Sequence, residues 1–321
     1  MKAVFFGTPA FAVPSLERLI LSHHPVVGVV TQPDRPRGRD RRSGDGPVKL
    51  VALRSRIPVL QPDRLKDEGF LAALATLGAD VGVVAAYGKL LPESLLAIPR
   101  QGFINVHASL LPKYRGAAPI QRAVVAGERE TGVSIMRIVR ELDAGPVLAT
   151  RVTTIGNDET SEAVERRLAD LGADLLVETL DDLESGRARE TPQDGLGATY
   201  APRLVKEEGL IDWTAAAEVI HNKVRGLHPW PHAYTYLDHT RYLVLESAVA
   251  PAGQETKPAS AGEIPRPGEI VEAARGTLSV ATGGGSRLYL LRLQPEGRRA
   301  MSAREFLAGH RVSPGMLFGP G

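Results

Sequence analysis

The sequence has no cysteine, no long apolar run and no excess of charge of one sign. Without cysteine the chain has no disulfide framework, no thiolate metal site, no cysteine nucleophile and no iron–sulfur cluster. Its 39 Lys and Arg residues stand against 37 Asp and Glu residues, which leaves a formal charge of +2. Because the whole surface then does not attract a polyanion, any nucleic-acid site has to be a local basic patch.

The apolar stretches are too short for a membrane protein. None approaches the roughly 20 residues that span a bilayer. The apolar start Ala3–Phe6 stops at Gly7, well short of the about 7–15 apolar residues of a secretory signal. We therefore expect a soluble, cytoplasmic protein that does not associate with membranes.

What the chain does have is the composition of a globular protein. Of its 321 residues, 43% are hydrophobic and 24% are charged, a balance that can bury a core and argues against disorder. At about 150 residues per domain, this length predicts two domains.

The first part of the chain alternates short β-rich runs with segments of helical periodicity. We expect strands at Lys2–Phe6, Pro25–Thr31, Asp80–Ala86, Phe103–His107, Val133–Val139 and Val147–Ile155. We expect helices at Ala10–Ser22, Pro47–Arg56, Leu65–Leu77, Pro119–Ala126 and Ser161–Leu183. Such alternation predicts a mostly parallel sheet flanked by helices, an α/β domain that we place at residues 1–189.

The pattern changes after this domain. Residues 190–207 are polar, contain Gly and Pro and keep no period, so we interpret them as a surface linker. In residues 208–321 we expect one helix and then short strands, at Thr214–Arg225, Arg241–Val249, Glu269–Ala273, Thr277–Thr282 and Arg287–Gln294. Regularly spaced short strands predict a small C-terminal β-barrel.

The glycine-rich stretches do not fit a nucleotide site. Gly7 follows the first expected strand, but no G-x-G-x-x-G is present. The stretch Gly82–Lys89 resembles a phosphate loop, yet it has one residue too many between its glycines, and Leu90 stands where Ser or Thr should bind magnesium. Since neither stretch completes its motif, neither supports a nucleotide-binding site.

Two polar residues lie at the end of an expected buried strand. Asn105 and His107 project to the same face of that strand, whereas a buried parallel strand should be apolar on both faces. Ligands of open α/β sheets bind at the carboxyl ends of the strands. The pair is therefore either part of a ligand site or an Asn and a His satisfied by loop carbonyls.

A carboxylate favours the first interpretation. Asp143 follows the strand ending near Val139, in a turn-rich loop that we expect beside the carboxyl ends of the same strands. Together the three groups can run acyl transfer without a covalent intermediate. Asn105 would donate to the developing oxyanion and His107 would help stabilise it, while Asp143 would take a proton from an attacking amine and pass it to the leaving nitrogen.

Other constellations fit their chemistry less well. Ser109 with His107 and Asp143 has the residue types of a hydrolase triad, but no G-x-S-x-G elbow surrounds the serine. His228 and His232 have the spacing of metal ligands on a helix. Prolines between them forbid that helix, so we expect a packed aromatic turn around Trp230.

A basic cluster precedes the second expected helix, within eight positions: Arg35, Arg37, Arg39, Arg41 and Arg42. Such a run is either a solvated face or a set of phosphate contacts. On the loop after the second strand, the arginines would lie at the rim of the expected cleft and could clamp an RNA end.

Several segments match, in order, those of a known family: VFFGTPAFAVPSLERL near the start, TQPDRPRGR from Thr31, VVAAYGKLLP from Val83, INVHASLLPKYRGAAPIQRAVVAGERETGVSIMRIVRELDAGPVL at 104–148, and KEEGLIDW and HPWPHAY in the second domain. The chain thereby resembles the methionyl-tRNA formyltransferases and their folate-dependent relatives across both domains.

This resemblance implies a function and a set of roles. In the family, the Asn and His of the N-x-H motif and the Asp of the L-D-x-G motif are catalytic. These residues map to Asn105, His107 and Asp143. The segment that contacts folate maps to Ser109, Leu110, Leu111 and Pro112. The donor is 10-formyltetrahydrofolate, a co-substrate, the acceptor is charged initiator tRNA, and the product is formylmethionyl-tRNA for translation initiation.

The resemblance also implies a Rossmann-type catalytic domain, and a C-terminal barrel that is similar to an oligonucleotide-binding fold and contacts tRNA phosphates together with the five arginines. We expect a monomer without a metal, since positioning and oxyanion stabilisation replace a Lewis acid. Two other functions remain open: the same donor with an amino sugar nucleotide or water as acceptor, and a tRNA-binding module on a disused catalytic fold.

Overall fold

The computed structural model describes residues 1–34, 44–251 and 265–319. The chain forms two compact units. The first comprises Met1–Pro119, Glu130–Thr154 and Glu165–Pro202, and the second Ile120–Arg129, Ile155–Val164 and Arg203–Gly321.

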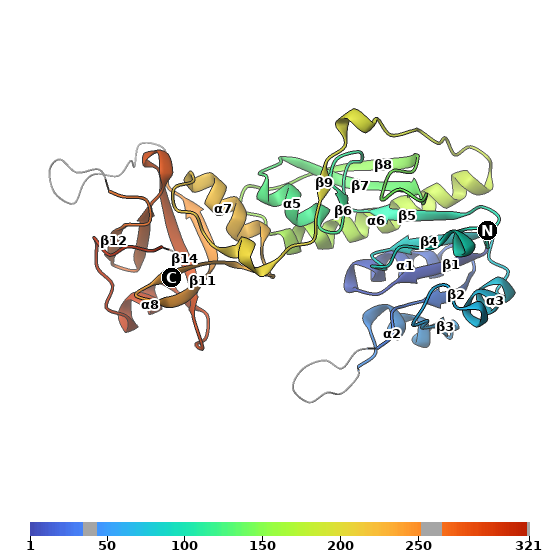
Figure 1. Ribbon diagram of the computed structural model, residues 1–321, viewed down its shortest axis with the longest axis horizontal. Coiled ribbons are helices and arrows are strands. Elements are labelled where there is room, and N and C mark those ends of the chain that lie inside the picture. The colour runs from blue at the N-terminus through green and yellow to red at the C-terminus, as the bar shows by residue number, and fades with distance from the viewer. Residues whose placement is uncertain (35–43, 252–264, 320–321) are drawn as a thin grey trace. The chain divides into compact units, whose positions relative to one another are not determined.

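The first unit contains a seven-stranded sheet of order β3-β2-β1-β4-β5-β7-β8 (Figure 1). Its strands are β1 (Ala3–Gly7), β2 (Val26–Val30), β3 (Val59–Leu60), β4 (Val81–Ala85), β5 (Phe103–His107), β7 (Glu130–Arg137) and β8 (Val147–Thr154). The first five run parallel, whereas β7 is antiparallel to β5 and to β8. The predicted mostly parallel sheet is therefore confirmed, with β7 as the one strand of this sheet that runs in the opposite direction.

The central strands of the sheet carry apolar residues on both faces, and these residues are buried. All five residues of β1 and of β4 are buried, as expected for strands covered by helices on both sides. Phe6 packs edge-on against Phe103 with ring centroids 5.3 Å apart. Burial of one such ring contributes about 1.5–3 kcal/mol to folding, so this core holds β5 and the polar residues at its end in place.

The helices up to residue 184 lie close to their predicted places, apart from one short helix at Glu93–Leu96 that the sequence patterns do not predict. They are α1 (Val13–Leu21) after a 3-10 turn η1 (Ala10–Ala12), α2 (Pro47–Arg54), α3 (Glu68–Thr76), α4 (Glu93–Leu96), α5 (Pro119–Val125) and α6 (Ser161–Glu184). The side chain of Asp67 caps α3 by accepting from the Phe70 backbone N–H at 2.9 Å. Among the described residues, no helix combines the length and apolarity that crossing a membrane requires.

The second unit is built on antiparallel strands in the order β10-β11-β14-β13-β12, with β15 paired to β14. Its elements are η3 (Lys206–Gly209), α7 (Ala217–Gly226), β10 (Ala233–Leu237), β11 (Thr240–Val249), β12 (Ile270–Ala274), β13 (Thr277–Ala281), η4 (Gly283–Gly285), β14 (Arg287–Pro295), β15 (Met301–Ser302) and α8 (Ala303–Gly309). Near the C-terminus, Gly319 bridges Tyr236 of β10 and Leu317 bridges Glu269 beside β12. These bridges join the two edges of the sheet, so the expected small β-barrel is present.

Two elements of this barrel escape the sequence patterns. β10 alternates buried Ala233, Thr235 and Leu237 with half-buried tyrosines, but the strands that we expect in this unit begin only at Arg241. α8 begins at Ser302, whose hydroxyl and Glu305 form a capping box. With seven residues the helix is too short to show a clear period.

The segment interpreted as a linker also has structure of its own. It contains η2 (Gly195–Gly197) and the short strand β9 (Tyr200–Ala201), which pairs in parallel with β6 (Arg115–Gly116). The sequence pattern predicts only a surface linker here, because pairing with a strand some 85 positions earlier leaves no local period in the sequence. The segment thus lies against the chain that follows β5.

Candidate active site

Asn105 and His107 lie on the last three residues of β5, between β4 and β7. Asn105 is in register with Val84 on one side and Met136 on the other, and His107 with Ser134. The side chain of Asn105 is half-buried and makes no hydrogen bond within the part of the chain that the structure describes. Its amide N–H groups therefore remain available to a ligand, which argues against the alternative that loop carbonyls satisfy it.

The hydrogen bond of His107 fixes its proton. Its ring is buried, and Nε2 lies 3.0 Å from the carbonyl oxygen of Tyr114. Because a carbonyl oxygen only accepts, Nε2 carries a hydrogen. In the neutral ring Nδ1 is then the nitrogen without a proton, and it is the atom that faces Asp143.

Asp143 lies beside His107 in the structure. Its Oδ2 is 3.8 Å from His107 Nδ1, an ion-pair distance longer than a direct hydrogen bond. The same oxygen accepts from the backbone N–H of Gly116 at 2.8 Å. Asp143 has a left-handed backbone with φ of 48°, a conformation that a non-glycine residue adopts only when its surroundings hold it there.

The route by which Asp143 reaches the site differs from the expected one. We expected its loop to leave a strand parallel to β5 at the carboxyl end of the sheet. Instead β7 is antiparallel, and Ile138 bonds to the carbonyl of Phe103 at the amino end of β5. The loop must then run back along β5 to bring Asp143 beside His107.

Ser109 is buried and already hydrogen-bonded. Its hydroxyl donates to the carbonyl of Lys113 at 2.6 Å, and its own carbonyl accepts from the hydroxyl of Ser134 at 2.8 Å. Ser134 Oγ also accepts from the backbone N–H of Leu111 at 3.2 Å. With His107 bonded to Tyr114 instead, the arrangement lacks the serine–imidazole contact of a hydrolase triad.

These bonds give the segment from Ser109 to Pro112 a fixed path beside the site. The peptide between Leu111 and Pro112 is cis. The folate contacts assigned to this segment stay a prediction.

Gln193 is a polar contact of the Asp143 loop that the sequence patterns missed. Its amide nitrogen donates to the carbonyl oxygens of Asp143 and Gly145, at 2.9 and 2.7 Å. Its amide oxygen accepts from the guanidinium of the buried Arg115. Nearby, the hydroxyl of Thr199 accepts from the N–H of Tyr114 at 2.8 Å. No motif in this segment marks either residue.

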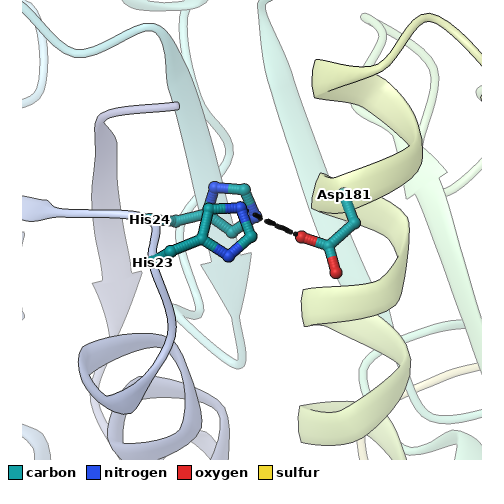
Figure 2. A group of neighbouring side chains, drawn as sticks. All are labelled: His23, His24 and Asp181. Carbon is teal, nitrogen blue, oxygen red and sulfur yellow. Dashed lines mark hydrogen bonds and ion pairs between the residues drawn. The ribbon is translucent and has the colours of Figure 1, made fainter.

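A second cluster of titratable groups joins the turn before β2 to α6. Figure 2 shows the rings of His23 and His24 facing Asp181, and this is the one group of three potential metal ligands among the described residues. Both ring nitrogens of buried His24 already have partners, the Met1 amine at 3.0 Å and Asp181 at 2.9 Å. Burial is the main cause that lowers the pKa of His24, with the Met1 ammonium next. The hydrogen bonds of the cluster thus connect the turn before β2 to α6.

The proline-rich turn of the second unit brings two imidazoles together. The rings of His228 and His232 pack against each other with centroids 5.3 Å apart, and Glu162 Oε2 lies 3.9 Å from His228 Nε2. Among the described residues, these side chains do not form a group of three potential metal ligands. Trp230 is 47% exposed, so the expectation that the turn packs around it was wrong. The two imidazoles form its centre instead.

The basic cluster of Arg35, Arg37, Arg39, Arg41 and Arg42 lies outside the described residues. Asp34 and Asp45, which flank it in sequence, both form ion pairs with Lys49. The hydrogen bond from Lys49 holds the pKa of Asp34 below its usual value. The tRNA contacts assigned to the arginines stay a prediction.

Comparison with known proteins identifies the family. Models described as formyl transferase and formyl transferase, C-terminal domain, match residues 1–180 and 203–311. Methionyl-tRNA formyltransferase of Heliobacterium modesticaldum is 46% identical over 319 residues, which cover 99% of this chain and 100% of the relative. The chain belongs to the methionyl-tRNA formyltransferase family.

Further comparisons extend this assignment. The methionyl-tRNA formyltransferase of Citrifermentans bemidjiense is 45% identical over 99% of this chain and 96% of its own length. A solved N-formyltransferase from Helicobacter canadensis, in complex with folinic acid and dTDP-3-aminofucose, superposes with a TM-score of 0.65 over 90% of this chain and 98% of that one. At 15% identity the latter shows a shared fold. Family membership thus rests on relatives that match both units.

Proposed function

We propose that the protein transfers the formyl group of 10-formyltetrahydrofolate to the α-amine of methionyl-tRNA and so supplies formylmethionyl-tRNA for translation initiation. The observation that carries this proposal is the grouping of three side chains: an Asn105 amide without a hydrogen bond to any described residue, an oriented His107, and the carboxylate of Asp143, 3.8 Å from that ring. Relatives that match nearly the whole chain bear the corresponding name.

Asn105 acts on the oxygen of the formyl group. When the amine attacks the formyl carbon, the carbonyl oxygen takes up negative charge, and a donor already in place stabilises it without reorganisation. The Asn105 side chain is suited to this task because its N–H groups make no hydrogen bond within residues 1–34, 44–251 and 265–319. The tetrahedral intermediate then expels N10 of the folate as the C–N bond breaks.

His107 and Asp143 move the proton that the reaction has to transfer. The attacking amine must lose a proton and the leaving N10 must gain one, so a single relay serves both ends of the reaction. Asp143 accepts the proton and returns it to N10. Nδ1 of His107 lies 3.8 Å from this carboxylate, and the ring helps to stabilise the charge that develops on the formyl oxygen.

Acceptor binding involves both predicted domains in this proposal. The arginines between residues 35 and 42 contact phosphates of the tRNA acceptor end, and the barrel at residues 208–321 supplies further phosphate contacts. The donor site includes the segment from Ser109 to Pro112. The chain acts as a monomer in the cytoplasm.

A competition between acceptors tests the proposal. The purified protein is mixed with 10-formyltetrahydrofolate and either methionyl-tRNA or a dTDP-amino sugar, and the formylated product is measured. Transfer to methionyl-tRNA alone is expected. Transfer to the amino sugar alone would contradict methionyl-tRNA as the acceptor. Binding of tRNA without transfer to either acceptor would indicate a binding module instead of an enzyme.

A further inference from the structure

The amide of Gln193 uses all of its hydrogen-bonding capacity at the candidate site. Its nitrogen donates to the carbonyl oxygens of Asp143 and Gly145, at 2.9 and 2.7 Å. Its oxygen accepts from Nε and Nη2 of Arg115, at 3.1 and 2.7 Å. A primary amide offers two N–H groups and two lone pairs, so no capacity is left for solvent or substrate.

The donor side of this amide holds the turn that carries Asp143. The two carbonyls it binds belong to residues on either side of Ala144, and Asp143 keeps a left-handed backbone there. A Cβ on Gly145 would lie 1.9 Å from the carbonyl oxygen of Arg137, so the turn packs directly on β7. Gln193 is bonded to both ends of the turn and limits how it can rotate.

The acceptor side connects this turn to the segment after β5. Arg115 precedes Gly116, whose N–H binds the Asp143 carboxylate, and follows Tyr114, whose carbonyl orients His107. One side chain therefore connects the backbone of the acid to the segment that contacts both the acid and the imidazole. Pairing of β6 with β9 holds the segment after β5 against the segment that carries Gln193.

We propose that Gln193 is a positioning residue that sets the Asp143 carboxylate relative to His107, and that efficient formyl transfer depends on its amide N–H groups. This inference rests on the proposed role of Asp143. It assigns to the segment at 190–207 a part in the active site in place of a simple connection between domains.

Two substitutions separate the two sides of the amide. Gln193→Glu retains an oxygen acceptor for Arg115 but loses the donors to the loop, whereas Gln193→Met keeps the length of the side chain and loses both. We expect both variants to lower kcat about 10- to 100-fold, the effect of a misplacement of about 1 Å, with KM for both substrates within about twofold of wild type. Hydrogen exchange of residues 138–146 should become faster in both.

Glu190→Gln is the matched control. Glu190 ties the same segment to Arg137 by an ion pair at 2.8 Å, without bonding to the Asp143 turn. Its loss should leave kcat unchanged. Asp143→Asn, measured in parallel, keeps the two hypotheses apart: if it is inactive while Gln193→Glu has wild-type kcat, the role of Gln193 is overturned and that of Asp143 stands. A wild-type kcat of Asp143→Asn would overturn the proposed function instead.

A loss of kcat in Gln193→Met but not in Gln193→Glu would show that only the anchoring of Arg115 matters, and would also overturn the proposal. Melting temperatures measured for each variant establish that the protein is folded at the assay temperature.

Discussion

His107 Nδ1 lies 3.8 Å from Asp143 Oδ2 although the loop that carries Asp143 begins at the opposite end of β5. The antiparallel direction of β7 makes this contact depend on the fold of the nine-residue connection between β7 and β8, not on the sheet alone. The carbonyl of Tyr114 orients His107, and the N–H of Gly116 binds the carboxylate of Asp143. Both groups come from the segment that follows β5. The site is thus assembled from strand, loop and the segment after β5.

Replacement of Asn105 tests the oxyanion donor. We expect Asn105→Ala to lower kcat about 10²–10³-fold, the cost of removing one donor from an oxyanion hole. Because the side chain makes no hydrogen bond within the described residues, its removal should leave the melting temperature nearly unchanged. Steady-state kinetics with thermal denaturation checks both; a wild-type kcat in the folded variant would refute the role.

Ser109→Ala distinguishes the proposed transfer from a hydrolase mechanism. A serine nucleophile would cost about 10⁴-fold or more in kcat when removed. Ser109 instead bonds to the carbonyl of Lys113, so we expect kcat within about tenfold of wild type and an increase in KM for the folate donor. A KM that stays unchanged would argue against the folate role of the segment.

The salt dependence of the reaction tests the basic cluster. Each phosphate contact contributes about 0.7–0.9 to the slope of log affinity against log salt concentration. We expect kcat/KM for methionyl-tRNA to fall steeply with NaCl, and Arg37→Ala combined with Arg39→Ala to lower both kcat/KM and the slope. The exposed pair Arg54→Ala and Arg56→Ala changes the charge equally and serves as the control. Equal effects of both pairs would mean that the cluster has no specific role.

The stability of the fold should decrease in mild acid because of His24. Burial and the Met1 ammonium lower its pKa from the usual 6.5, while Asp181 and Glu184 oppose the shift. Below about pH 6.5 the unfolded chain then binds more protons at this site than the folded chain. Stability is therefore fully present above this pH and is lost as the pH falls toward the pKa of the folded state.

Urea denaturation at pH 7 and pH 5 measures this effect. His24→Gln should lose less stability on acidification than the wild type, since glutamine does not titrate. His239→Gln, a change at an exposed turn residue, should behave as wild type. An identical loss in all three proteins would rule out His24 as the acid-sensitive group.

The sequence predicts those features of the fold and of the site that show in the pattern of neighbouring residues. Polar Asn105 and His107 interrupt an apolar strand, and short loops between alternating elements imply a layered sheet. Asp143 lies beside His107 by a route other than the expected one, since nothing local to residues 130–137 shows that β7 runs antiparallel. Gln193 escaped detection because its partners are about 50 and 78 positions away, and only the folded chain brings them together.

One measurement tests the central claim most directly: single-turnover transfer from 10-formyltetrahydrofolate to charged initiator tRNA, with N-formylmethionine measured after release from the tRNA. The wild-type protein should form N-formylmethionine rapidly, and Asp143→Asn, folded and able to bind both substrates, should form it orders of magnitude more slowly. Equal rates in the two proteins would contradict the account.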